Sequence, residues 1–312
     1  MRIGVDIMGS DHGPQVPVRG AVRAAHDLPP EVRLVLIGDE QAIRRELRAQ
    51  GADPALFDIV PSRDDIGMED NPTKAFQTKP ESSISLGFQL LKAGKIDAFA
   101  STGNTGAMLV GSVVIIKPIP GVMRPCIPTL VPKDGGGVGI LLDVGANVDC
   151  KCEVLVQFGL LGALMAEHLY HIPAPTVGLI NIGEEERKGD ALRKETHPRM
   201  EACGRYRFAG NVEGRDLFRG KADVMVCDGF TGNVVLKVIE GFHDLLEEHG
   251  VQDPFLQRFN YQNYGGLPVL GVNGNVIIGH GISNEATIRS MVLAARDLVE
   301  SRLNERIQEA LK

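Results

Sequence analysis

Short β-rich runs alternate with longer helical patterns along almost the whole chain. This alternation is typical of strands joined by helical crossovers. It predicts an α/β fold in which helices cover both faces of a largely parallel sheet. The predicted strands are 3–7, 32–37, 57–60, 98–101, 138–143, 176–180, 222–227 and 276–278.

The end of the chain has the pattern of one long amphipathic helix. Apolar residues recur there at three- and four-residue steps. Ser283 is predicted to cap the start of this helix, and Glu285 lies in its first turn, where a negative charge is favourable. The apolar positions are Ile288, Val292, Ala295, Val299, Leu303 and Ile307.

Polar clusters rich in Gly, Asn and Asp stand where five of the predicted strands give way to helices. In open α/β folds the strand ends and helix N-termini meet at one edge, where backbone N–H groups favour anions. We therefore expect one shared site for a ligand that carries phosphate. The clusters are 6–11, 101–106, 143–147, 181–186 and 228–233.

Composition sets the outer limits of the interpretation. The chain has 312 residues, of which 43% are hydrophobic and 23% charged, so it can bury a large core. We expect a single domain over 1–312, or two tightly joined subdomains. The net charge of -7 gives no overall attraction to nucleic acid or to an anionic membrane.

The five cysteines are too few and too irregularly spaced for a disulfide framework, which favours a reducing cytoplasm. Cys150 and Cys152 leave a metal site open, but no second Cys or His pair has ligand spacing, so free thiols are preferred. The N-terminus leads directly into a predicted strand, so no signal peptide is expected. The apolar run 154–166 is too short to cross a bilayer.

Several familiar motifs are absent from the sequence. It contains no G-x-G-x-x-G, no G-x-x-x-x-G-K-[ST] and no G-x-S-x-G. Dinucleotide binding, P-loop hydrolysis and α/β-hydrolase chemistry therefore have no support. No cofactor is predicted.

Seven strings, in order along the chain, closely resemble the PlsX family, the bacterial phosphate acyltransferases. Together they are specific, although each alone would be weak. The strings are 6–14, 101–107, 141–149, 178–189, 210–216, 228–237 and 264–266 onward to 280–281.

The resemblance implies an enzyme that moves a long acyl chain from acyl carrier protein (ACP) to inorganic phosphate, giving acyl phosphate for phospholipid (phosphatidic acid) synthesis. It implies a three-layer α/β/α fold related to phosphotransacetylases and isocitrate-type dehydrogenases, and a homodimer. We expect a cytoplasmic protein with at most weak peripheral attachment to the inner face of the membrane. A CoA-dependent short-chain phosphotransacylase and a non-catalytic ACP-binding scaffold stay open as alternatives.

The residue types suit this reaction. Phosphate is an anionic nucleophile and a thiolate leaves readily, so the main needs are close placement of reactants and donors for the oxyanion. Asn104, Thr105, Thr231 and Asn233 are predicted phosphate and oxyanion ligands, and Asn104 and Asn233 are assigned to catalysis. The same residue types also serve as helix N-caps.

Charged residues add further candidates. Lys188 is predicted to place a positive charge at a phosphate or thioester oxygen, or else to pair with a nearby glutamate. Arg215 would clamp phosphate, or pair with Asp216 or Glu213. His280 is a candidate donor, or a packed loop histidine.

Carboxylates at the strand ends are open to two interpretations. Asp6, Asp11, Asp143 and Asp228 would hold magnesium. Alternatively, Asp6 and Asp228 accept hydrogen bonds from loop N–H groups and so shape the site. We prefer the second and predict no metal. The remaining predicted substrate-binding residues are Asn147, Asn181 and Glu184.

ACP is acidic, so its docking needs a local basic patch. The candidate patches are Arg187, Lys188, Arg193 and Lys194, or Arg289, Arg296 and Arg302. Family members usually have a longer helical pair where this chain has only 238–260. Weaker membrane attachment is therefore expected.

Overall fold

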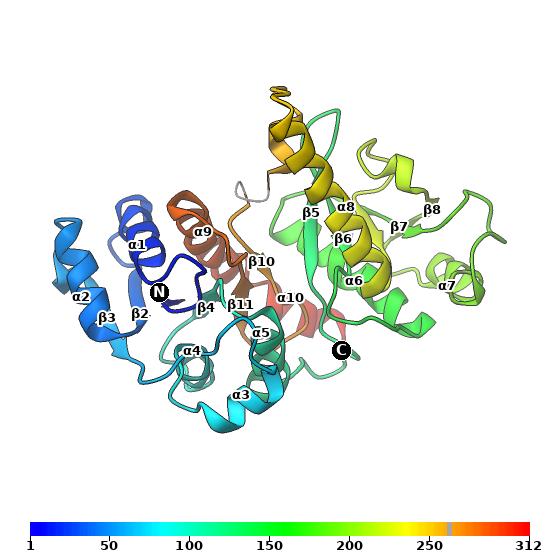
Figure 1. Ribbon diagram of the computed structural model, residues 1–312. Helices are drawn as coiled ribbons and strands as arrows, with labels where there is room; N and C mark the ends of the chain where they lie inside the picture. The colour runs from blue at the N-terminus through cyan, green and yellow to red at the C-terminus, as the bar shows by residue number, and fades with distance from the viewer. Residues whose placement is uncertain (261–263) are drawn as a thin grey trace. The chain divides into compact units, whose positions relative to one another are not determined.

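The computed structural model describes residues 1–260 and 264–312, which divide into two compact units (Figure 1). Unit 1 takes in Met1–Pro118 and a C-terminal stretch that ends at Asn304. Unit 2 begins at Ile119 and also holds Glu305–Lys312. Each unit has its own sheet, so the strands predicted for one sheet belong to two. The single domain over 1–312 stays a prediction.

The sheet of unit 1 has the order β10-β11-β4-β1-β2-β3. Its strands run parallel except β10, which pairs antiparallel with β11 at one edge. Ile3 in the central strand lies opposite Leu34 on one side and Ala98 on the other. The strands are β1 (Arg2–Asp6), β2 (Arg33–Gly38), β3 (Phe57–Pro61), β4 (Ala98–Ser101), β10 (Leu267–Pro268) and β11 (Asn275–Ile278).

Helices cover both faces of this sheet (Figure 1). On one face Ile84 and Phe88 pack with Phe99 of β4 in an apolar cluster. On the other face Gly20 packs directly against Ile288, because a side chain at position 20 would meet it. The helices are α1 (Gln15–Asp27), α2 (Glu40–Ala49), η1 (Pro54–Leu56), α3 (Pro72–Thr78), α4 (Ser83–Lys92), α5 (Thr105–Gly111), η2 (Ser112–Ile116) and α9 (Glu285–Ser301).

The sheet of unit 2 has the order β5-β6-β9-β7-β8 and is parallel except for β5 at one edge. Its strands are β5 (Pro128–Pro132), β6 (Val138–Leu142), β7 (Thr176–Ile180), β8 (Arg207–Val212) and β9 (Val224–Val226). The helices are α6 (Cys152–His168), α7 (Ala191–Ala202), η3 (Gly214–Asp216), α8 (Gly229–Glu248) and η4 (Leu256–Phe259). The last helix, α10 (Leu303–Ala310), begins at the end of unit 1, and its remaining residues belong to unit 2. The apolar run 154–166 is buried within α6, as predicted.

All eight predicted strands are present, with ends that differ by at most two residues. The pattern missed three edge or near-edge strands. β5 has a proline at each end, β8 contains Gly210, and β10 has only two residues. Proline and glycine mark loops more often than strands, which explains the omission.

The long C-terminal helix is interrupted. Arg302 adopts a left-handed conformation, with φ of +52°, and separates α9 from α10. The N-cap is Asn284, whose side chain accepts the Thr287 N–H, whereas the Ser283 hydroxyl donates to the His280 carbonyl. The predicted cap was therefore wrong by one residue.

Within residues 1–260 and 264–312, no helix combines the length and the apolar character needed to cross a bilayer.

Candidate functional site

Two loops of unit 2 meet at the end of neighbouring strands β6 and β9. The Cys227 N–H donates to the Leu142 carbonyl, and the Asp143 N–H donates back to the Cys227 carbonyl. The Gly229 N–H then donates to the Asn147 carbonyl at 2.7 Å. Clusters 143–147 and 228–233 are therefore adjacent, as the strand-end pattern predicted.

Asp143 organises the first of these loops. Its side chain is buried and accepts the backbone N–H groups of Ile127, Ala146 and Asn147 at 3.0, 3.2 and 2.7 Å. The Asn147 amide also donates to this carboxylate, at 3.0 Å, and to the Pro125 carbonyl. Burial raises the pKa of Asp143, although these hydrogen bonds oppose the rise. Asp143 and Asn147 thus hold the loop in shape.

The second loop ends at the N-terminus of α8, where Asp228 is the N-cap. Its carboxylate accepts the N–H and the hydroxyl of Thr231 at 2.9 and 3.0 Å. The guanidinium of Arg193, from α7, donates to the same carboxylate and, at 3.0 Å, to the Thr231 hydroxyl. Only 11% of the Arg193 side chain and 9% of the Asp228 side chain are exposed, so this is a buried ion pair.

Arg193 was expected in an exposed patch for ACP, and that expectation is wrong. It lies on the buried face of α7 with Thr196, His197 and Met200. The spacing of these four residues, at three- and four-residue steps, was the signal available in the sequence. The position of Arg193 beside Asp228 makes it a site residue that sequence reasoning missed.

The Asp228 pKa leads to a prediction about acid stability. Burial raises this pKa, but the Thr231 N–H and the Arg193 guanidinium lower it more, so it lies below its ordinary value of 3.8. A carboxyl group whose pKa is lowered by folding stabilises the fold at pH values above 3.8. This contribution disappears as the pH falls through the pKa of the folded state. We expect the difference in unfolding free energy between wild type and Asp228→Asn to shrink below that pH. Urea denaturation of both proteins across this range would measure it, and a constant difference would contradict the assignment.

The loop after β7 also lies beside this group. The Asn181 amide donates to the Lys188 carbonyl at 3.1 Å, and Asp190 pairs with Arg193 at 3.0 Å. Gly189, between them, has φ of +91°, and a Cβ there would lie 2.3 Å from the Asn181 amide oxygen. This close approach explains the need for glycine.

The other predicted charges of unit 2 have partners on the surface. Lys188 is exposed and lies 3.9 Å from Glu185, so the alternative of a glutamate partner is realised. Arg215 is exposed and pairs with Glu213, again as the alternative foresaw. Glu184 pairs with Lys221 at 2.8 Å.

Asn233, in the first turns of α8, donates to the Val144 carbonyl at 3.1 Å. Its side chain therefore joins the helix to the loop that Asp143 organises. The predicted roles of Asn233 and Lys188 in catalysis stay predictions.

In unit 1 a second polar group follows β1 and β4. Asp6 is fully buried and accepts the Ser101 hydroxyl at 2.6 Å and the Met8 N–H at 3.0 Å. Burial raises the Asp6 pKa, and these bonds oppose the rise. The Ser101 oxygen in turn accepts the Gly103 N–H. Asp6 therefore joins two strand-end loops.

Asn104 is the N-cap of α5 and accepts the Ala107 N–H at 2.9 Å. Its amide nitrogen lies 3.0–3.1 Å from the carbonyl oxygens of Gly67, Met68 and Asp70. The amide oxygen of Asn104 thus holds the start of α5, and its amide nitrogen holds the loop 67–70. A direct catalytic role for Asn104 stays a prediction, and the N-cap alternative is realised.

The remaining predicted residues of unit 1 are exposed. Thr105 is the first residue of α5. The Asp11 N–H donates to the Gly281 carbonyl at 3.1 Å, which brings the loop with His280 to the first loop. Two of the five clusters thus belong to unit 1 and three to unit 2.

Cysteines whose pKa is raised stay protonated thiols at neutral pH. Burial, with the nearby charges of Asp143 and Asp228, raises the Cys150 pKa to about 11. Burial also raises the pKa of Cys227 well above its ordinary value of 9.0. A thiol with so high a pKa is a poor nucleophile at neutral pH. These two residues do not suit a covalent acyl intermediate.

Two clusters of potential metal ligands occur among residues 1–260 and 264–312: Cys152, Glu153 and Glu195, and Glu184, Glu213 and Asp216. In the second cluster the Lys221 ammonium lies 2.8 Å from Glu184 and 3.4 Å from Asp216. That cation already compensates the carboxylates. In the first cluster, Arg199 pairs with both glutamates at 2.8 Å.

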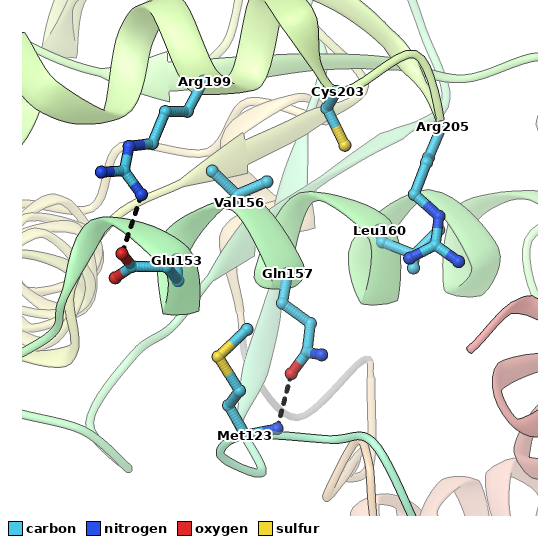
Figure 2. A pocket seen from close by; sticks show the side chains of 8 residues that line it. All are labelled: Met123, Glu153, Val156, Gln157, Leu160, Arg199, Cys203 and Arg205. Carbon is cyan, nitrogen blue, oxygen red and sulfur yellow. Dashed lines mark hydrogen bonds and ion pairs between the residues drawn. The ribbon is translucent and has the colours of Figure 1, made fainter. Parts of the chain in front are cut away.

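A cavity of about 230 Å³ opens beside α6 and α7 (Figure 2). Its charged groups are already paired. Arg199 binds Glu153 at the edge, and Arg205 donates to the Ala310 carbonyl. Gln157 accepts the Met123 N–H at 2.7 Å, which fixes the opposite wall. The charged and amide side chains around this cavity are thus already bonded within the protein.

The chemistry available in unit 2 follows from these contacts. The N-terminus of a long helix favours an anion, and Arg193 balances the carboxylate that caps it. At that terminus the Thr231 hydroxyl bonds Asp228 and Arg193, and the Asn233 amide donates to the Val144 carbonyl. The Lys188 ammonium belongs to the loop after β7, where it lies beside Glu185. Groups of these types suit a small oxyanion and a developing negative charge. That they bind phosphate here stays a prediction.

Solved structures place this architecture in a known class. A phosphotransacetylase from Streptococcus pyogenes superposes with a TM-score of 0.68 at 18% identity, covering 96% of this chain and 94% of that one. A branched-chain phosphotransacylase from Enterococcus faecalis gives 0.64 at 12% identity, covering 96% and 99%. The fold is therefore the α/β fold of the phosphotransacylases, as predicted.

Sequence comparison identifies the family. A family model described as "Fatty acid synthesis protein" matches residues 1–251. A phosphate acyltransferase from Desulforamulus reducens is 41% identical over 330 residues, covering 100% of this chain and 98% of the relative. One from Brevibacillus brevis is 40% identical over 331 residues, with the same coverage. The chain belongs to the phosphate acyltransferase family, and the resemblance to PlsX proteins is confirmed.

Proposed function

We propose that this protein transfers an acyl group from the thioester of ACP to inorganic phosphate. The observation that carries the proposal is the closed pair of loops at the N-terminus of α8, where Asp228, Arg193 and Thr231 form one buried network. The names of the relatives, phosphate acyltransferases, supply the reaction class.

The reaction needs no covalent enzyme intermediate. A phosphate oxygen attacks the thioester carbonyl carbon, a C–O bond forms, and the C–S bond breaks with its electron pair leaving on sulfur. The thiolate then takes a proton. The high thiol pKa values of Cys150 and Cys227 agree with direct attack. In this scheme, Thr231 and Asn233 bind oxygen atoms, and Lys188 neutralises charge on phosphate or the thioester oxygen.

Purified protein incubated with palmitoyl-ACP and phosphate tests the proposal. We expect phosphate-dependent release of ACP thiol and an acyl phosphate that hydroxylamine traps. Release from acyl-CoA but not from acyl-ACP would favour the short-chain alternative. Absence of acyl phosphate from both would favour a non-catalytic scaffold.

Asn233→Ala and Lys188→Ala are each expected to lower turnover by at least about tenfold, because losing one oxyanion donor commonly costs more. Circular dichroism should be unchanged, since both residues are exposed. Lys237→Ala, one turn further along α8, is the matched control and should keep turnover within about twofold, as expected for a surface pair. Wild-type rates in the first two variants would remove these residues from the mechanism.

The protein is further proposed to act as a homodimer with only weak peripheral attachment to membranes. The aligned length of 330 residues means that the Desulforamulus relative has residues that this 312-residue chain lacks. A short apolar group with one arginine, Phe255 to Phe259, offers little area for amphipathic binding. In sedimentation with anionic vesicles we expect a smaller bound fraction than for that relative. Equal or tighter binding that resists salt would contradict this expectation.

A further inference from the structure

An apolar cavity of about 280 Å³ lies in unit 2 between α8 and η4. Residues of α8 form one wall, and Phe218 with η4 forms the other. The cavity is lined by Phe218, Val238, Ile239, Phe242, His243, Leu246, Phe255, Leu256 and Phe259. His243 is the one polar residue among them, and it is buried.

The η4 wall is built into the unit. Phe259 packs edge-on against Phe218 and Phe255, with ring centres 5.0 and 5.3 Å apart. The Arg258 guanidinium donates to the carbonyl groups of Lys133 and Gly137, which tie η4 to the turn between β5 and β6. Asp253, shortly before η4, accepts the Phe255 and Leu256 N–H groups.

The chemistry of the wall selects the kind of occupant. A polar ligand would lose its hydrogen bonds to water there and gain almost none in return. A hydrocarbon chain would exchange water for apolar contact along its whole length. The cavity therefore suits an alkyl chain.

The cavity and the polar network share one helix face. Thr231, Val235, Val238, Phe242 and Leu246 follow one another on α8 at three- and four-residue steps, so they form a single stripe. Thr231 bonds Arg193 at the polar end, and Val235 packs on the core of unit 2. The stripe from Thr231 to Leu246 is about 22 Å long at the helical rise per residue. An acetyl group cannot span such a distance, whereas a long alkyl chain can.

We propose that this cavity holds the distal part of the substrate acyl chain and so sets the preference for long chains. The proposal rests on acyl transfer at the N-terminus of α8, as argued above. It adds a specificity site on the same helix, far from the reacting atoms.

Leu246→Trp fills the cavity and tests the proposal. We expect the ratio of kcat/KM for palmitoyl-ACP to kcat/KM for octanoyl-ACP to fall at least about tenfold. Effects of this size are seen when a hydrophobic pocket no longer accepts a methylene group of the substrate. Leu246→Ala enlarges the cavity and should move the preference the other way. The matched control is Leu245→Trp, because Leu245 is the next residue on α8 but is exposed and does not line the cavity. The control should leave the ratio within about twofold.

Calorimetric binding of hexadecyl phosphate and octyl phosphate separates this proposal from the proposed reaction. If wild type releases no thiol from palmitoyl-ACP or octanoyl-ACP, the proposed acyl transfer fails. The alkyl site is still supported if hexadecyl phosphate binds more tightly than octyl phosphate and Leu246→Trp weakens that binding. Equal binding of both probes overturns the cavity proposal. So does an unchanged chain-length ratio in a folded Leu246→Trp protein. A loss of dimer in light scattering with that unchanged ratio would instead make the cavity a contact between copies.

Discussion

Replacing Gly232 with alanine is expected to lower turnover by about a hundredfold while the protein still folds. A Cβ at this position in α8 would lie 1.9 Å from the carbonyl oxygen of Asp143, a contact that no real structure accommodates. Because both atoms belong to backbone or are fixed to it, α8 must move away from the loop. Displacing reacting groups by about 1 Å can cost about 10²-fold in rate. Turnover of acyl-ACP, together with thermal unfolding, measures the two effects separately.

The same helix provides the control. A Cβ at Gly241 meets no atom within 4 Å. Gly241→Ala should therefore stabilise the protein by about 0.5–1 kcal/mol, because alanine suits a helix interior better than glycine. Its turnover should match wild type. Equal activity losses in both variants would show that α8 tolerates no change, and the argument from the close contact at Gly232 would fail.

Asp228→Ala is expected to lower the free energy of unfolding by about 3–5 kcal/mol, the usual cost of leaving one member of a buried ion pair alone. Here the residue left alone is Arg193, whose side chain is 11% exposed. Loss of the N-cap contributes about 1 kcal/mol of that cost. Turnover should also fall sharply, because the Thr231 hydroxyl loses the carboxylate that accepts its hydrogen bond. Urea denaturation gives the stability, and phosphate-dependent thiol release gives the activity.

A double-mutant cycle separates the ion pair from the cap. In Asp228→Ala with Arg193→Leu, the uncompensated charge is gone, so the double variant should be more stable than Asp228→Ala alone. Asp190→Ala is the comparison on the exposed side of Arg193, since the Asp190 side chain is 59% exposed. It should lose only about 1 kcal/mol, mostly as the N-cap of α7. Additive effects of Asp228→Ala and Arg193→Leu would show that the two charges are not coupled.

Short β-rich runs and the 3.6-residue helical period were enough to predict the central strands and their order of appearance. They depend on local burial, which strands such as β1 and β4 show at nearly every residue. The patterns could not tell that the strands form two sheets, because strand pairing depends on contacts distant in sequence. They also missed β5, whose prolines are tolerated only because it lies at an edge.

The candidate site was also predictable only where it depends on residues close together in the sequence. Cluster 228–233 could be placed at a helix start because cap residues follow a strand directly. The ion pair of Arg193 with Asp228 joins residues 35 positions apart, and nothing local in the sequence marks it. Lys188 and Arg215 have the glutamate partners, and Asn104 the N-cap bond, that the sequence offered as alternatives, since short-range partners are the ones a sequence can foresee. Their roles in the reaction stay predictions.

The edges of the two sheets have a consequence for the purified protein in concentrated solution. Three of the four edge strands contain proline, at Pro61 in β3, Pro268 in β10 and both ends of β5. Proline cannot donate a hydrogen bond to an added strand. The fourth, β8, shifts register against β7 between Val177 and Leu179, which disrupts the regular ladder. Among the strands of the described residues, each of the four edges therefore carries a feature that disfavours strand-by-strand aggregation.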